Sequence, residues 1–195
     1  MKMIDMQGQL GRRRVFAVAS LLIASLAMTV AQESGLVANK VKAAMVYNFT
    51  KYVEWPASSF PAPTSPLVIG VIGKDPIMAE IDSTLKGKAV EKRVLAVRQF
   101  SDVAEARGCH VVFICASERK RLPKILEQLK KENTLTVSDL EGFVEEGGMI
   151  GFRKEANTIR FDINQSTAEK AGLKVSSKLL QLARAGRGDR GSVKP

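Results

Sequence analysis

The fold is decided by the stretch LVIGVI, residues 67–72, a short and continuous apolar run bounded by proline and glycine. A run of this kind is typical of a strand that is buried on both faces of a parallel sheet. Asp75 follows as a candidate N-cap, with Pro76 at the first helical position, and residues 77–85 carry apolar side chains at helical spacing. This unit of strand, turn and helix indicates a parallel α/β sheet.

The same unit recurs along the middle of the chain. Residues 90–97 and 110–114 are predicted strands separated by a short helix over 102–106, and a helix over 117–131 leads to a strand over 134–137. Strands that alternate with helices predict an α/β fold, a Rossmann-like and mostly parallel sheet flanked by helices.

The two ends of this domain have a different pattern. Residues 37–53 place apolar side chains three and four positions apart, which predicts an amphipathic helix that ends before Pro56. Residues 149–153 and 158–163 are separated by so short a link that they predict an antiparallel hairpin. The second of these strands alternates apolar and charged residues, so we expect it at the sheet edge. A closing helix follows, capped by Asn164, interrupted at Gly172 and resuming at Ser176 or Ser177.

The first residues predict an export signal. Arg12, Arg13 and Arg14 precede an uncharged, mostly apolar run that ends in small residues at Ala31, which is the pattern of a secretory signal peptide. We therefore expect residues 1–31 to be removed, leaving a mature periplasmic protein that begins at Gln32. A transmembrane anchor is the alternative, but a bilayer span needs about 20 apolar residues and this run is shorter. General secretion is a simpler route than a twin-arginine signal, because no cofactor site requires export of a folded chain.

Charge and composition describe the mature chain as one basic globular domain. The 195 residues carry a net charge of +10, and the predicted signal holds four basic residues and one acidic residue, which leaves +7. Residues 32–183 form the expected α/β domain. Residues 184–195 combine basic residues with glycine and predict a disordered tail, with contact to anionic lipid as the alternative. Export disfavours nucleic acid as a partner.

The two cysteines, Cys109 and Cys115, bracket a predicted strand. Six residues of extended strand span about 20 Å, whereas a disulfide needs Cα atoms about 4.4 to 6.8 Å apart. We predict that they do not bond to each other within one regular strand. Three alternatives stay open: the strand curls at its end, the thiols are buried and free, or one of them pairs with another chain.

No catalytic constellation is present in the sequence. His110 is the single histidine, and the metal-binding patterns based on paired histidines or cysteines are missing, so we expect no metal, no cofactor and no enzymatic activity. Cys109 and His110 make a poor nucleophile and base, because adjacent strand residues point to opposite faces. The turn over residues 73–75 opens a helix at the end of a parallel strand, which allows a small-anion pocket without identifying a ligand.

Candidate partner-binding residues concentrate at two places. Tyr47 and Trp55 lie on the first helix and at its exit, in a chain otherwise poor in Tyr and Trp, and both residue types are frequent interface anchors. Arg153 and Arg160 lie on the predicted hairpin, where they offer charge to an acidic partner beside an edge strand. Packing of the aromatic side chains onto the sheet is the alternative.

Four segments together are more specific than a generic α/β pattern. They are VKAAMVYNFTKYVEWP (residues 41–56), GGMIGF (147–152), IRFDIN (159–164) and AGLKVSSKLLQLA (171–183). Their order and spacing resemble the YfiR family over nearly the whole mature chain, from about Val37 to Ala183.

The resemblance implies a function. It implies a periplasmic repressor that acts on an inner-membrane diguanylate cyclase of the YfiN type or another sensor protein, and so controls cyclic-di-GMP and biofilm formation. An outer-membrane lipoprotein that sequesters the repressor is a further implied partner, and a homodimer with redox-sensitive disulfides is implied as well. This sequence departs from that pattern because residues 67–72 contain no cysteine that could pair with Cys109. A periplasmic small-ligand receptor without a cyclase partner is the alternative function, and a hydrolase ranks last.

Overall fold

The computed structural model describes residues 35–156 and 158–185. The chain divides into two compact units, residues 1–38 and 39–195, and the fold set out below is that of the second unit. The predicted signal peptide, residues 1–31, lies outside the described residues, as do residues 186–195 of the predicted tail. Among the helices that the structure describes, none combines the length and the apolar character needed to span a bilayer.

The domain alternates strands with helices. A first helix, residues 35–52, of which residues 39–52 belong to this unit, precedes the labelled elements. These are β1 (Val53–Glu54), η1 (Ala57–Ser59), β2 (Leu67–Ile72), α2 (Ile77–Leu85), β3 (Ala89–Val90), β4 (Arg93–Phe100), η2 (Val103–Ala106), β5 (Val111–Ile114), η3 (Ala116–Arg121), α3 (Leu122–Leu129), β6 (Leu135–Ser138), β7 (Ile150–Glu155), β8 (Thr158–Ile163), α4 (Gln165–Lys170), β9 (Lys174–Val175) and α5 (Ser177–Ala185).

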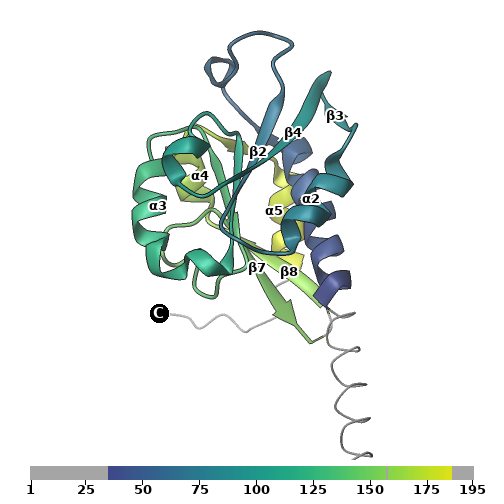
Figure 1. Ribbon diagram of the computed structural model, residues 1–195, viewed down its shortest axis with the longest axis vertical. Helices are drawn as coiled ribbons and strands as arrows, with labels where there is room; N and C mark the ends of the chain where they lie inside the picture. Colours follow the sequence, from purple (N-terminus) through teal and green to yellow (C-terminus); the bar gives the residue numbers. More distant parts are fainter. Residues whose placement is uncertain (1–34, 157, 186–195) are drawn as a thin grey trace, which may run out of the picture. The chain divides into compact units, whose positions relative to one another are not determined.

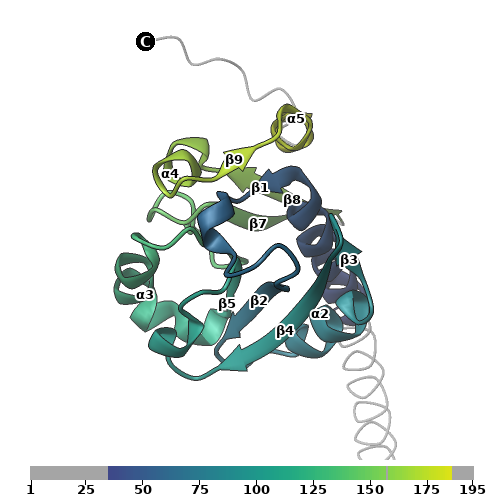
Figure 2. The ribbon, with the colours of Figure 1, turned by 90° about the horizontal axis from the view of Figure 1, so that it is seen from above.

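A seven-stranded sheet runs through the described domain in the order β3-β4-β2-β5-β6-β7-β8. The strands from β4 to β7 are parallel, and β3 and β8 add one antiparallel strand at each edge. The chain passes from β2 to β4 on one side and returns to β5 on the other, so the strand order reverses at β2 (Figure 2). The predicted fold class is confirmed, and β8 lies at the sheet edge as its alternating pattern predicted.

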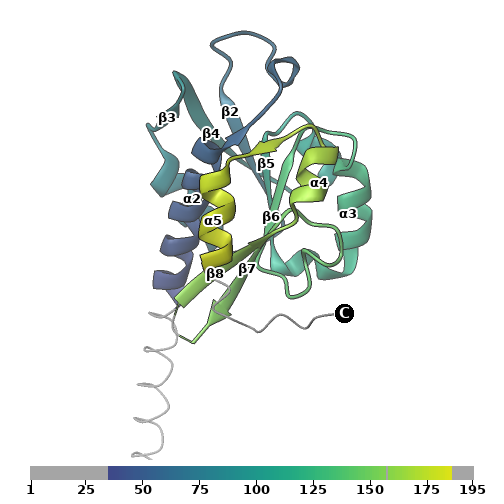
Figure 3. The same ribbon diagram turned by 180° about the vertical axis from the view of Figure 1, so that it is seen from behind.

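Helices cover both faces of the sheet. The first helix, α2 and α5 lie together on one face, whereas α3 lies on the opposite face (Figures 1 and 3). Phe49 of the first helix fixes the C-terminal hairpin to this layer, because its ring centroid is 5.7 Å from that of Phe152 and 5.1 Å from that of Phe161. The core on the α3 side includes Val103, Val112, Ile114, Leu122, Ile125 and Leu129.

The sequence predicted a single strand over residues 90–97, and the structure corrects this prediction. β3 ends at Val90 and β4 begins at Arg93, and the two residues between them, Glu91 and Lys92, have φ angles of 49° and 70°. Positive φ at both positions is the geometry of a two-residue type I′ hairpin turn, which usually contains Asn or Gly. Neither Glu nor Lys signals such a turn in a sequence, so the strand break was missed.

The closing region follows the predicted plan with one addition. The Asn164 side chain caps α4 by accepting a hydrogen bond from the Thr167 N–H at 3.0 Å, and α5 begins at Ser177. Between the two helices, β9 pairs antiparallel with β1, with Val175 opposite Val53. Strands of two residues are too short to carry a period, so the sequence did not predict this pairing.

Cys109 and Cys115 are both free and buried. Cys115 belongs to the core beneath the first helix, whereas Cys109 belongs to the core beneath α3. The prediction that these cysteines do not bond to each other is confirmed.

Candidate functional site

Trp55, at the exit of the first helix, is half-buried and tied to the sheet. Its indole Nε1 donates a hydrogen bond to the backbone carbonyl of His110 at 3.0 Å. The indole also meets the imidazole of His110 edge-on, with the ring centroids 6.1 Å apart. Trp55 therefore combines a packing role with a face that reaches the surface, as an amphipathic aromatic side chain does.

His110 fastens the connector that follows Trp55 to the amino end of the sheet. Its Nδ1 accepts the N–H of Val68 at 3.0 Å, so Nε2 carries the proton and donates to the carbonyl of Ser59 at 3.2 Å. The ring of Phe60 stacks on the imidazole, with centroids 4.3 Å apart. On Phe60 in turn lies the guanidinium of Arg93, 3.7 Å from the ring centroid. Trp55, Phe60, Arg93 and His110 are called the amino-end latch below.

The hydrogen bonds of the amino-end latch require a neutral imidazole, and the surroundings of His110 favour the neutral ring. Burial lowers the pKa of His110 from the ordinary value of 6.5, and the charge of Arg93 lowers this pKa further, against an opposing hydrogen bond to the Ser59 carbonyl. A protonated ring would point an N–H from Nδ1 at the N–H of Val68, where an acceptor is needed. The imidazole is therefore a structural acceptor at neutral pH.

Tyr47 lies under two lysines. The Nζ atoms of Lys51 and Lys88 are 4.3 Å and 4.4 Å from its ring centroid. Lys178 of α5 lies over Tyr52 in a similar way, at 5.3 Å. Lys88 and Lys178 come from parts of the chain distant from the first helix, and the fold places their charges beside the last turns of that helix.

Three groups of aromatic side chains and cations lie along the last turns of the first helix and its exit, and together they are called the basic aromatic surface. We use that name for Tyr47, Lys51, Tyr52, Trp55, Phe60, Lys88, Arg93 and Lys178. Lys51 and Lys178 are exposed, and the aromatic rings are half-buried. Aromatic anchors surrounded by cations suit an acidic protein surface, because the rings supply contact area and the charges supply complementarity.

Arg153 and Arg160 lie elsewhere, on the β7–β8 hairpin, where they face each other across the two strands. Arg153 bonds to Asp162 and to Glu155, both at 3.0 Å, and Arg160 lies 3.9 Å from Glu155. Two arginines and two carboxylates make this group locally neutral. Only Arg160 presents much of its side chain to solvent, with 46% exposed against 23% for Arg153.

Two of the four predicted residues thus lie on the first helix and at its exit, and the other two lie opposite each other on the β7–β8 hairpin. Tyr47 and Trp55 share the basic aromatic surface, and Tyr47 adjoins Lys88, next to the β3 edge of the sheet. Arg160 lies on β8, the strand at the opposite edge, and Arg153 lies on the neighbouring strand β7. The sequence could not reveal the roles of Lys88, Arg93 and Lys178, because their partners are far away in the chain.

The buried thiols are unreactive. Burial raises the pKa of Cys109 to about 11, against a smaller opposing effect of Arg98. Burial also raises the pKa of Cys115 to about 12, helped by the negative charges of Asp75, Asp139 and Glu118. Both thiols stay protonated at neutral pH and are poor nucleophiles. Over the described ranges, 35–156 and 158–185, no three His, Cys, Asp or Glu side chains gather in a way that could hold a metal ion.

The match to known proteins covers the whole domain. A family model described as YfiR/HmsC-like matches residues 39–184. The chain belongs to the YfiR/HmsC-like family. Members of this family are regulatory proteins of the periplasm rather than enzymes, and the family suggests a regulator of a diguanylate cyclase.

Other comparisons add little to the YfiR/HmsC-like assignment. No curated protein matches the chain. Among solved structures, a conserved domain protein from Vibrio cholerae O1 biovar El Tor strain N16961 is 14% identical, with a TM-score of 0.46. The likeness covers 60% of this chain and 53% of the Vibrio chain, so the present chain spans about half the length of that protein.

Proposed function

We propose that this YfiR/HmsC-like protein is exported to the periplasm and represses an inner-membrane diguanylate cyclase of the YfiN type. The observation that carries the proposal is the family match, which runs through the entire domain from residue 39 to residue 184. Repression lowers cyclic-di-GMP and hence surface attachment. The protein acts by binding the periplasmic sensor region of the cyclase and carries out no catalysis.

The proposed contact is the basic aromatic surface. Trp55 and Tyr47 are its anchors, and the exposed cations Lys51 and Lys178 select an acidic face on the sensor region. Arg160, at the β8 edge, offers a second and weaker contact, because Glu155 and Asp162 neutralise the hairpin locally. A homodimer and an outer-membrane lipoprotein that sequesters the protein belong to the same proposal.

A genetic experiment tests the function. Deleting the gene raises cyclic-di-GMP and attachment if the protein is a repressor, and deleting the cognate cyclase as well restores the low level. Unchanged cyclic-di-GMP in the single deletion, in a genome that holds a cyclase with a periplasmic sensor region, would refute the proposal. It would favour the small-ligand receptor instead.

A further inference from the structure

A crevice opens at the end of the sheet opposite the amino-end latch. It lies where β4, β2 and β5 end, at the reversal of strand order. In open α/β sheets this reversal is the general position for ligands, because the loops on either side diverge and leave a gap beyond the carboxyl ends of the strands. The volume of the crevice, about 470 Å³, falls in the usual range for small-molecule sites.

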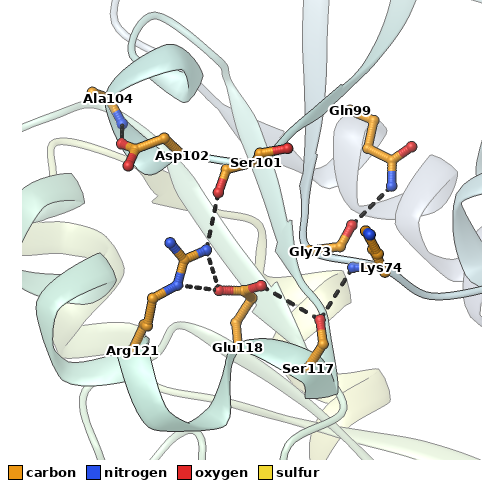
Figure 4. Close-up of polar contacts among 9 residues, drawn as sticks. All are labelled: Gly73, Lys74, Gln99, Ser101, Asp102, Ala104, Ser117, Glu118 and Arg121. Carbon is orange, nitrogen blue, oxygen red and sulfur yellow. Dashed lines mark hydrogen bonds and ion pairs between the residues drawn. The ribbon is translucent and has the colours of Figure 1, made fainter.

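A network of hydrogen bonds holds the walls of this crevice in place (Figure 4). Arg121 contacts Glu118 through Nε and Nη2, at 2.6 and 2.5 Å, and its Nη2 also donates to the carbonyl of Ser101 at 3.0 Å. The Ser117 hydroxyl accepts the N–H of Lys74 at 3.1 Å. The ends of β2 and β4 are thereby tied to η3.

Gly73 allows the close approach that shapes the crevice. Its φ angle is +100°, and a Cβ at this position would lie 2.5 Å from the Ser117 hydroxyl oxygen and 2.9 Å from Glu118. A side chain here would push the exit of β2 away from η3. Gln99 fixes the same glycine from the β4 side by donating to its carbonyl at 2.8 Å.

The network leaves polar groups available to a ligand. Glu118 is 8% exposed, and both Arg121 contacts go to its Oε2. Its Oε1 meets the Ser117 hydroxyl at 3.4 Å, a long hydrogen bond that leaves this oxygen able to accept more. Lys74 is exposed at the rim, where its ammonium group provides a positive charge.

We propose that this crevice binds a small polyhydroxy anion. Hydroxyl groups of the ligand donate to Glu118 and exchange hydrogen bonds with Ser117 and Gln99, while its phosphate or carboxylate group lies against Lys74. Phe100 supplies an apolar wall. The proposal does not rest on the cyclase as partner, because the crevice and the basic aromatic surface lie at opposite ends of the sheet.

Titration of the protein purified from the periplasm tests the site. The probes are ribose 5-phosphate, ribonate, ribose and inorganic phosphate, followed by calorimetry and by backbone amide NMR shifts. We expect at least one of the two polyhydroxy anions to bind, roughly tenfold or more tightly than ribose or phosphate alone, since each of these lacks one charge-assisted contact. Ribose 5-phosphate and ribonate then show whether phosphate or carboxylate is preferred. Amide shifts should centre on residues 73, 74, 117 and 118.

Matched variants separate a binding site from a purely structural network. Lys74→Ala and Glu118→Gln should each weaken binding about tenfold, whereas Lys124→Ala and Glu127→Gln, exposed on α3, should leave it unchanged. If Glu118→Gln fails to fold, Lys74→Ala and Ser117→Ala decide, because both alter exposed side chains. Three results would overturn the proposal: no binding of either polyhydroxy anion at millimolar concentration, wild-type affinity in the crevice variants, or amide shifts centred elsewhere.

Discussion

The two ends of the parallel sheet differ in chemistry. At the amino end, rings and cations close over the strands, with Phe60 stacked 4.3 Å from the buried imidazole of His110. At the carboxyl end, the side chains of Lys74, Gln99 and Ser117 are exposed around an open crevice. The side chains at the amino end of the sheet pack against one another, whereas those at the carboxyl end surround an open crevice.

From this difference we expect separate roles for the two ends of the sheet. Stacked aromatic rings and a buried acceptor contribute to the stability of the domain and would keep the proposed contact surface rigid. Exposed polar side chains contribute little to folding and stay available for a ligand. Substitutions at the amino end should therefore change stability far more than substitutions at the carboxyl end.

The largest effect is expected from His110→Ala. The change removes a buried ring from between Trp55 and Phe60 and leaves the Val68 N–H without its acceptor, which should lower the free energy of unfolding by about 3 kcal/mol. Ser117→Ala, at the carboxyl end, should cost less than about 1 kcal/mol. Urea denaturation measures both. Equal losses in the two variants would remove the distinction between the ends.

A glycine comparison probes the carboxyl end. Gly73→Ala should cost about 2 kcal/mol, because the backbone is left-handed and the new Cβ would collide with Ser117 and Glu118. Gly108→Ala is the matched control, with φ of +77° but no atom of the described residues within 4 Å of the point where a Cβ would lie, and should cost about 1 kcal/mol. If both variants lose the same stability, the close approach at Gly73 is unimportant.

Much of this fold follows from local patterns. Short apolar runs located the buried strands, and the alternation of residues 158–163 placed β8 at the edge. The β3–β4 turn could not be predicted from the sequence, because Glu91 and Lys92 adopt positive φ under tertiary constraint and not through their intrinsic backbone preferences. The pairing of β1 with β9 joins residues far apart in the chain, and no local pattern reports it.

Of the residues in the candidate site, only the aromatic ones could be predicted from the sequence. Tyr47 and Trp55 stood out because such residues are rare in this chain. Arg153 and Arg160 were predicted at a second place, the hairpin, but the sequence did not reveal that Glu155 and Asp162 pair with them, because a strand pattern gives the face of a residue and not its ion-pair partners. Glu118, Arg121 and Ser117 form part of an ordinary polar helix start in the sequence and acquire meaning only beside the end of β2.

The pH dependence of stability tests the amino-end latch further. The pKa of His110 is lowered in the folded protein, so the unfolded chain binds a proton more readily as the pH falls below about 6.5. The contribution of this histidine is thus fully present above pH 6.5 and is lost as the pH falls toward the lowered pKa. Urea midpoints between pH 5 and 7.5 should show this loss in the wild type. The variant His110→Asn has no titrating side chain at this position, so its urea midpoint should depend less on pH than that of the wild type. Equal pH dependence in the two proteins would contradict the role of His110 as a neutral acceptor in the amino-end latch.

The smallest effect on stability is expected at the exposed cations. Lys51→Glu and Lys178→Glu should change the free energy of unfolding by no more than about 0.5 kcal/mol each, because both side chains are exposed. Thermal unfolding of the two variants checks this expectation. A larger loss would mean that the cations hold the rings of Tyr47 and Tyr52 in place and are not free for a partner.

The most direct test of the account measures cyclic-di-GMP in a deletion strain that carries the cognate cyclase. The strain is complemented with wild-type protein, with the double variant Lys51→Glu and Lys178→Glu, or with Lys124→Glu as a control on α3. If the basic aromatic surface binds an acidic sensor region, the wild type and the control lower cyclic-di-GMP and the double variant, exported at an equal level, does not. Full repression by the double variant would contradict the proposed contact, and failure of the wild type to repress would contradict the proposed function itself.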